Sequence, residues 1–128
     1  MWADDRASQA MGMSIEDIAP GSARLTMTVT EQMVNGLGLC HGGYIFSLAD
    51  SSMAFACNSH NERAVAQHCS ISYLRPAKLG MRLVAAARET SRAGRTGIID
   101  VSVTADNGEI IAEFRGASRE LGHRFFED

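Results

Sequence analysis

Alternating apolar and polar positions dominate the second half of the chain. Four runs show the two-residue period that is typical of half-buried strands, and they cover residues 64–74, 81–91, 96–106 and 109–121. The sequence Asp-Asn-Gly at 106–108 joins the last two runs as a hairpin. A second hairpin loop is expected at Ser91–Arg95. The pattern therefore predicts an antiparallel meander of four strands.

The first half of the chain predicts a strand followed by a helix. Leu25, Met27 and Val29 alternate with threonines, as in a half-buried strand, and a short helix is expected before them. Residues 44–58 contain no Gly or Pro and many good helix formers, so they predict a helix of about 15 residues. This helix is apolar nearly all round, and such a helix has to be covered by the rest of the fold.

One strand, one buried helix and four further strands predict an α+β fold, in which an antiparallel sheet wraps around one long central helix. A chain of 128 residues has the usual length of one domain, so we expect a single domain over residues 1–128. One sheet with one helix leaves strand edges and apolar surface uncovered. We therefore expect two chains to associate, edge to edge or helix to helix.

Composition argues against several classes of function. The formal net charge of −3 provides no overall basic field for nucleic acid. No segment has the roughly 20 apolar residues of a membrane span. Asp4 and Asp5 occur where a signal peptide would be basic, so a cytoplasmic protein is expected. His60, His68 and His123 lack the spacing of a metal cluster, so no metal site is expected.

Asp50 is the only charged residue in the predicted helix. A buried carboxylate costs free energy unless it is paired. Two interpretations follow: a polar residue bonded to hydroxyls such as those of Ser47 or Ser51, or a nucleophile or general base with a shifted pKa.

Gly42 and Gly43 lie where the predicted helix begins. Amide N–H groups in the first turn of a helix have no partner inside the helix, and they can stabilise a developing oxyanion. The two glycines could equally serve only to let the backbone turn tightly.

Gly42 and Asp50 of one chain are too far apart along the predicted helix to act on the same carbonyl group. Eight residues of helix place them about 12 Å apart, whereas a reacting carbonyl must lie about 3 Å from its oxyanion donors and similarly close to its nucleophile. If both residues act on one carbonyl, Gly42 of one chain must work with Asp50 of another.

The spacing Asn35-x5-His41-Gly42-Gly43-x6-Asp50 resembles the signature of PaaI-type acyl-CoA thioesterases of the hotdog fold. The similarity continues through residues 71–87 and 108–116 and covers most of the chain from about Gly12 to Gly116. The resemblance implies hydrolysis of (hydroxy)phenylacetyl-CoA or a related acyl-CoA thioester in phenylacetate catabolism. It implies no cofactor, because coenzyme A is part of the substrate. It also implies a homodimer that pairs into a homotetramer as a dimer of dimers.

The same resemblance implies roles for single residues. The Gly42 N–H would polarise the thioester carbonyl, and Asp50 of the facing chain would attack it or activate water. Asn35 would hold the thioester or water, His41 would fix the turn that carries Gly42, and Ser51 would hydrogen-bond near the carboxylate.

Further residues are candidates for substrate binding. The candidates for contact with coenzyme A are Gly43, Arg75, Lys78, Arg92 and Arg95. The candidates for the acyl pocket are Leu37, Leu39, Phe46 and Met53. Solvated loop charges and ordinary core residues would give the same pattern.

Two alternatives to this function stay open, and the sequence argues against a third. A medium-chain acyl-CoA could be the substrate, and a hotdog protein could bind acyl-CoA as a sensor without turnover. A hydratase of this fold would have a histidine in a different arrangement, which Asp50 argues against. Some relatives carry a serine on the strand before the Tyr-x-x-Pro segment. This chain has Ala66 there, which argues against a serine-assisted variant of the reaction.

Overall fold

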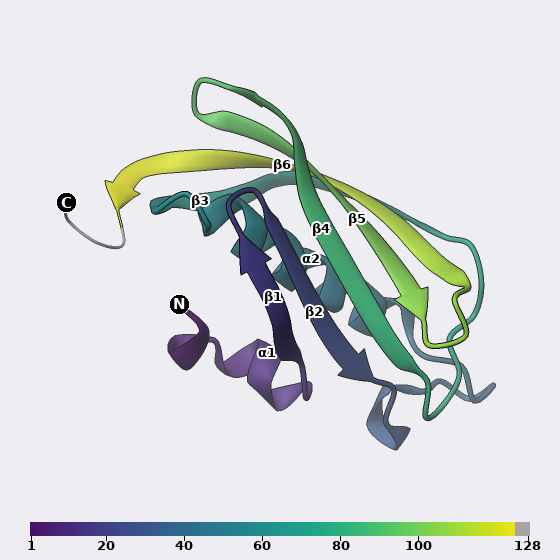
Figure 1. Cartoon of the computed structure of the whole chain (residues 1–128). Coiled ribbons are helices and arrows are strands. Elements are labelled where there is room, and N and C mark those ends of the chain that lie inside the picture. The colour runs from purple at the N-terminus through teal and green to yellow at the C-terminus, as the bar shows by residue number, and fades with distance from the viewer. Residues whose placement is uncertain (125–128) are drawn as a thin grey trace.

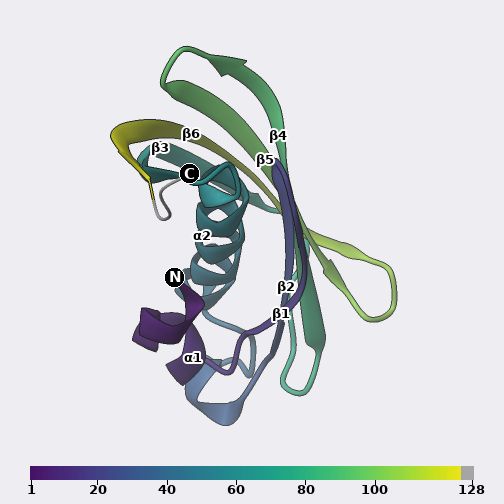
Figure 2. The same cartoon turned by 60° about the vertical axis from the view of Figure 1, so that its left-hand side comes forward.

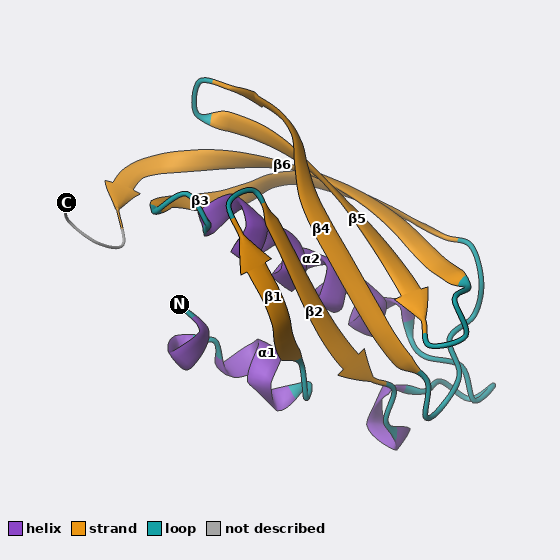
Figure 3. Ribbon diagram, in the orientation of Figure 1, coloured by secondary structure: helices purple, strands orange, loops and turns teal. Residues whose placement is uncertain are grey.

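A six-stranded antiparallel sheet curves around one long helix, α2 (Gly42–Asn58), in the computed structural model of the chain (Figure 1, Figure 3). The structure describes residues 1–124, except for the side chains of His123 and Arg124. The strands are β1 (Ser14–Ala19), β2 (Ser22–Thr28), β3 (Glu62–Tyr73), β4 (Arg82–Ala93), β5 (Thr96–Ala105) and β6 (Ile110–Arg124). This arrangement confirms the α+β hotdog fold.

The sheet forms because its strands alternate as predicted. In the sheet order β1-β2-β4-β5-β6-β3, strand β5 lies near the middle. Its inward residues Ile99, Val101 and Val103 are fully buried, while Asp100 and Ser102 between them point to the outer face. Burial of each such side chain contributes about 1.5–3 kcal/mol to folding. The sheet thus presents one continuous apolar face to α2.

The helix α2 begins at Gly42, two residues earlier than predicted, because His41 caps it. The His41 side chain accepts a hydrogen bond from the Gly43 N–H at 3.0 Å, which satisfies one of the amides that the first turn leaves free. The His41 N–H donates to the Met33 carbonyl at 2.7 Å and fixes the preceding loop. His41 therefore joins the first turn of α2 to the preceding loop.

Helix α2 packs closely on β6 where Met53 meets Gly116. Met53 is 1% exposed, and a Cβ atom built at Gly116 would overlap the Met53 sulfur. A side chain at 116 would therefore require Met53 to move, and the reason is space rather than backbone conformation, because the φ of Gly116 is not in the left-handed region.

The N-terminal segment lies beside α2 (Figure 2). It consists of η1 (Trp2–Asp4) and α1 (Arg6–Ala10), which confirms the predicted short helix. The Trp2 ring packs on Phe55 with 5.9 Å between centroids. The Ser8 hydroxyl lies 2.8 Å from the Ser51 hydroxyl, within hydrogen-bond distance. The segment is thus docked on the helix at two points.

Two predictions about strands were wrong. The chain has two strands before α2, not one: β1 was missed because it is an exposed edge strand, with Ile18 42% exposed, and shows no clear alternation. The loop predicted at Ser91–Arg95 is shorter, since β4 continues to Ala93 and pairs there with Thr96. Gly94, with φ of 60°, makes the tight turn.

The two edges of the sheet are β1 and β3. In the part of the chain that the structure describes, β3 pairs only with β6, and most of its residues are exposed, including Val65. An unpaired strand edge with exposed apolar side chains favours pairing with another chain.

Candidate functional site

The first turn of α2 carries an amide without a partner. The Gly42 N–H donates to no acceptor among residues 1–124, whereas the Gly43 N–H is bonded to His41 and the Tyr44 N–H to the His41 carbonyl at 3.0 Å. The positive end of the helix dipole lies at the same place. The Gly42 N–H is therefore available to a negatively charged oxygen, and the Gly43 N–H is not.

Tyr73 packs directly against Gly42. A Cβ atom at Gly42 would lie 3.0 Å from the ring and the hydroxyl of Tyr73, so only glycine fits without movement. The Tyr73 hydroxyl donates to the Gly42 carbonyl at 2.9 Å. Burial raises the pKa of this hydroxyl, which keeps it a proton donor near neutral pH. Tyr73 was missed in the sequence because its partner lies 31 positions away.

Asn35 shares a hollow with Gly42. The hollow has a volume of about 360 Å³, and Tyr73, Arg75 and Leu39 also line it. The Asn35 side-chain oxygen accepts from the N–H groups of Leu37 at 2.9 Å and Leu39 at 3.2 Å, which orders the loop. The structure thus brings Asn35 and Gly42 to one hollow.

Asp50 is half-buried and has no hydrogen-bond partner within residues 1–124. The Ser47 hydroxyl donates to the Gly43 carbonyl at 2.8 Å, and Ser51 bonds to Ser8. The interpretation of Asp50 as a polar residue held by these two hydroxyls is therefore wrong. The prediction that Ser51 hydrogen-bonds near the carboxylate stays a prediction, and in this chain its hydroxyl lies 2.8 Å from the Ser8 hydroxyl. Burial raises the pKa of Asp50, which makes it a stronger base once it has lost its proton.

Asp50 and Gly42 line different hollows. The Asp50 hollow has a volume of about 260 Å³ and is lined by Ser47, Ser51 and residues of the N-terminal segment. It has no lining residue in common with the Gly42 hollow. One chain therefore does not bring Gly42 and Asp50 to one reacting atom, in agreement with their separation of about 12 Å along the helix.

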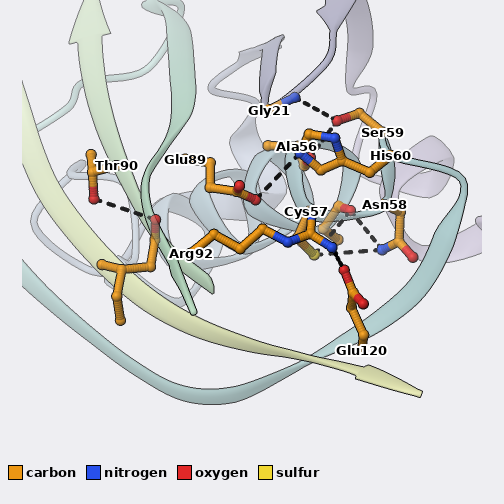
Figure 4. A network of polar contacts seen from close by, with 12 residues as sticks. Gly21, Ala56, Cys57, Asn58, Ser59, His60, Glu89, Thr90, Arg92 and Glu120 are labelled. Atoms are coloured by element: carbon orange, nitrogen blue, oxygen red, sulfur yellow. Dashed lines mark hydrogen bonds and ion pairs between the residues drawn. The ribbon is translucent and has the colours of Figure 1, made fainter. Parts of the chain in front are cut away.

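The four basic candidates lie at opposite ends of α2. Arg75 lines the Gly42 hollow and donates to the Ile110 carbonyl at 2.9 Å, and Lys78 bridges to Leu39 nearby. Arg92 and Arg95 instead lie around Cys57 in the last turn of α2. Figure 4 shows Arg92 paired there with Glu120 of β6. Arg92 is a strand residue, not a loop residue as expected.

The four acyl-pocket candidates do not form one pocket in a single chain. Met53 belongs to the core under the sheet, and Phe46 packs edge-on against Phe114 with 5.5 Å between ring centroids. Leu37 is 83% exposed. Of the four, Leu39 lines the Gly42 hollow.

The remaining histidines are scattered. His60 lies 3.5 Å from the Glu89 carboxylate at the end of α2, and His68 is exposed on β3. The side chain of His123 lies outside the described residues.

Among residues 1–124, no helix is long and apolar enough to cross a membrane.

Comparison with known proteins gives one consistent family. Residues 37–112 match the thioesterase superfamily. The chain is 42% identical to the acyl-coenzyme A thioesterase PaaI of Escherichia coli K12 over 122 residues, which are 95% of this chain and 87% of that protein.

Solved structures agree with this match. The structure of the E. coli PaaI protein from the phenylacetic acid degradation operon superposes with a TM-score of 0.95 at 41% identity, covering 97% of this chain and 90% of that one. The protein smu.793 of Streptococcus mutans UA159, solved with bound acetyl-CoA, has a TM-score of 0.84 at 29% identity, covering 88% of this chain and 90% of that one.

Proposed function

The chain belongs to the thioesterase superfamily, and on that premise we propose that it hydrolyses acyl-CoA thioesters to a free acid and coenzyme A. The name of its E. coli relative supports this activity, and the bound acetyl-CoA in the S. mutans neighbour supports the substrate class. Both the Gly42 and Asp50 positions lie inside the matched segment.

One observation carries the proposal: α2 holds two unpaired polar groups that complement a thioester under attack. The Gly42 N–H is an oxyanion donor, and such a donor contributes about 2.7–4 kcal/mol to the transition state. The Asp50 carboxylate, with its raised pKa, is the base or nucleophile. Within residues 1–124 neither group is engaged by another residue, so both are free to meet a ligand.

The proposed site is completed by a second chain. Because the two hollows are separate in one chain, Gly42 of one chain faces Asp50 of its partner across an antiparallel pair of α2 helices. Pairing of the exposed β3 edges brings the two helices together. Two such dimers pair into a tetramer, as the resemblance implies.

The reaction needs no group beyond these side chains and water. Asp50 attacks the carbonyl carbon directly or removes a proton from a water that attacks. Negative charge then develops on the carbonyl oxygen and is held by the Gly42 N–H. The C–S bond then breaks, and the coenzyme A thiolate leaves and takes up a proton. When water is the nucleophile, this step forms the free acid. When Asp50 is the nucleophile, it forms an anhydride with Asp50, which a water hydrolyses to release the acid and restore the carboxylate. Asn35 lies beside Gly42 and positions the thioester or water.

Coenzyme A would extend outward from the Gly42 hollow. Arg75 and Lys78 lie at that rim in the same chain, where they can contact phosphate groups. In an antiparallel pair, the last turn of the partner's α2 lies about 12 Å beyond the partner's Asp50, on the same side as this rim. The partner's Arg92 and the partner's Arg95 could therefore reach the same coenzyme A.

The acyl group of the proposed substrate is phenylacetyl, hydroxyphenylacetyl or a related group, and a medium-chain acyl group is the alternative. The origin of the E. coli structure from a phenylacetic acid degradation operon supports the first. A role in phenylacetate catabolism in the cytoplasm, with no cofactor, is part of the same proposal.

The deciding experiment is thiol release from phenylacetyl, hydroxyphenylacetyl, benzoyl, hexanoyl and acetyl esters of coenzyme A. Asp50→Asn is the matched control, because it keeps the shape of the side chain and removes the base. We expect turnover by the wild type and a loss of about 10²–10⁴-fold in the variant, with unchanged circular dichroism. Tight binding of an ester without turnover would instead favour an acyl-CoA sensor.

A further inference from the structure

The Asp50 hollow adjoins a larger hollow. That larger hollow, about 690 Å³ in volume, lies between α1, the short helix η2 (Glu31–Met33) and Tyr44 of α2. Ala7 and Met11 line both hollows, so the two adjoin along α1, and we refer to them together as the depression.

The N-terminal segment forms one wall of this depression and is held in place. Asp5 caps α1 by accepting from the Ser8 N–H at 3.0 Å, and it also accepts from the Ser8 hydroxyl at 2.8 Å. Ser8 in turn meets Ser51, the neighbour of Asp50, and Trp2 packs on Phe55. Ser8 is only 3% exposed. The wall is therefore fixed to α2 by a buried polar chain directly beside Asp50.

We propose that the acyl part of the substrate lies in this depression, against Ala7, Ala10 and Met11, so that the N-terminal segment selects the acyl group. This inference rests on the proposed function, in which Asp50 acts on the thioester carbonyl.

The geometry at the carbonyl supports this occupant. A thioester carbonyl has two substituents, sulfur and the acyl chain. Coenzyme A leaves toward the rim of the Gly42 hollow, so the acyl chain extends the other way, along the chain that supplies Asp50. The depression begins there, its α1 wall is made of methyl groups and a thioether, and its volume falls in the range of small-molecule sites, about 300–1,000 Å³.

The residues of the wall suit acyl selection. Ala7 and Ala10 are small and leave space, whereas the flexible side chain of Met11 adapts to ligands of different shape. A larger residue at 7 would shorten the space next to Asp50, and a smaller residue at 11 would lengthen it.

The test compares Ala7→Leu and Met11→Ala with wild type, with Ala3→Leu as the matched control. Ala3 is exposed on η1 and lines neither hollow. The first measurement is kcat/KM for acetyl-, hexanoyl-, phenylacetyl- and decanoyl-CoA. The second is the affinity of each ester, by calorimetry, for variants that carry the same substitutions together with Asp50→Asn.

We expect Ala7→Leu to lower kcat/KM for phenylacetyl- and hexanoyl-CoA about 10-fold or more relative to acetyl-CoA, since one or two misplaced methylenes shift selectivity about 10–200-fold. Met11→Ala should shift the preference toward decanoyl-CoA, and Ala3→Leu should change nothing.

Two results would overturn the inference: equal losses for all esters, or loss of the oligomer in Ala7→Leu by analytical ultracentrifugation, which would mean that a partner chain fills the depression. If the wild type turned over no ester but acyl-selective binding changed as expected, the proposed function would fail while the acyl site would stand. If no ester bound at all, the inference would fail as well.

Discussion

The two ends of α2 use their polar groups in opposite ways. At the last turn, Asn58 donates to the carbonyls of Ala54 at 2.7 Å and Ala64 at 3.2 Å and accepts from the Ala64 N–H at 2.8 Å. Ser59 accepts from the Gly21 N–H at 2.7 Å, and Arg92 pairs with Glu120, as Figure 4 shows. At the first turn, the Gly42 N–H is left unpaired beside an open hollow.

This contrast separates structure from function along one helix. A polar group bonded on all sides stabilises the fold and has nothing left for a ligand. A group that no other residue engages, beside an open hollow, stays available to a substrate. Substitutions at the last turn should therefore affect stability, and those at the first turn should affect catalysis.

The largest effect is expected from removing the Gly42 N–H. Proline fits the first position of a helix, and His41 before it already has the extended backbone, with ψ of 134°, that proline requires. We expect Gly42→Pro to lower kcat about 10²–10³-fold relative to Gly42→Ala. Both variants add a Cβ against Tyr73, so Gly42→Ala controls for that contact. Similar kcat values for the two would exclude this amide as the oxyanion donor.

Restoration of activity in a heterodimer is the next largest effect. A Gly42→Pro chain and an Asp50→Ala chain, each nearly inactive alone, are co-expressed with different tags and purified as a heterodimer. One of its two sites combines an intact Gly42 with an intact Asp50, so about half of the wild-type kcat per dimer is expected. The homodimers carried through the same purification are the controls. A heterodimer as inactive as its parents would mean that each chain has its own complete site.

Tyr73→Phe should have a smaller effect on catalysis. It removes the hydrogen bond to the Gly42 carbonyl while it keeps the ring against the helix, so the amide is positioned less well. We expect kcat to fall about 2–10-fold, as for one net hydrogen bond. The free energy of unfolding should change by less than about 0.5 kcal/mol, because Tyr73 is 49% exposed. Loss of stability with full kcat would assign Tyr73 to the fold alone.

Asn58→Ala should have the smallest effect on catalysis and a clear effect on stability. It leaves the backbone N–H and carbonyl of Ala64 without their partner. We expect a loss of about 1–3 kcal/mol in the free energy of unfolding by urea denaturation. The kcat per folded molecule should stay within about twofold of wild type. A large drop in kcat at full folding would abolish the contrast between the two ends of α2.

Periodicity was enough to predict the core of the fold but not its margins. Strand β5 and α2 were found because burial imposes a regular pattern on residues such as Ile99, Val101 and Val103. Strand β1 was missed because an exposed edge strand has no such constraint. The turn at Gly94 was placed too broadly because the pairing that extends β4 to Ala93 depends on the facing strand.

The site could be predicted in part for a similar reason. Asn35, His41 and Gly42 are close in sequence, so their spacing reveals them, and the structure brings Asn35 and Gly42 to one hollow. Tyr73 and the N-terminal segment reach α2 from distant parts of the chain, and no local pattern marks such contacts. Arg75 lies near the first turn of α2, and Arg92 and Arg95 lie near its last turn. These positions depend on the lengths of the strands, which the spacing of residues in the sequence does not determine.

The contact of Met53 with Gly116 has a consequence for how such sequences can diverge. The space beside Gly116 is already occupied by the Met53 sulfur, so a side chain at 116 would displace the end of the Met53 side chain. The effect of alanine at 116 therefore depends on the residue at 53, and a smaller residue at 53 would make alanine at 116 easier to accommodate. Because Met53 lies one turn beyond Asp50 on the same helix, a change at this pair would also alter the packing next to the carboxylate that we propose as the base or nucleophile.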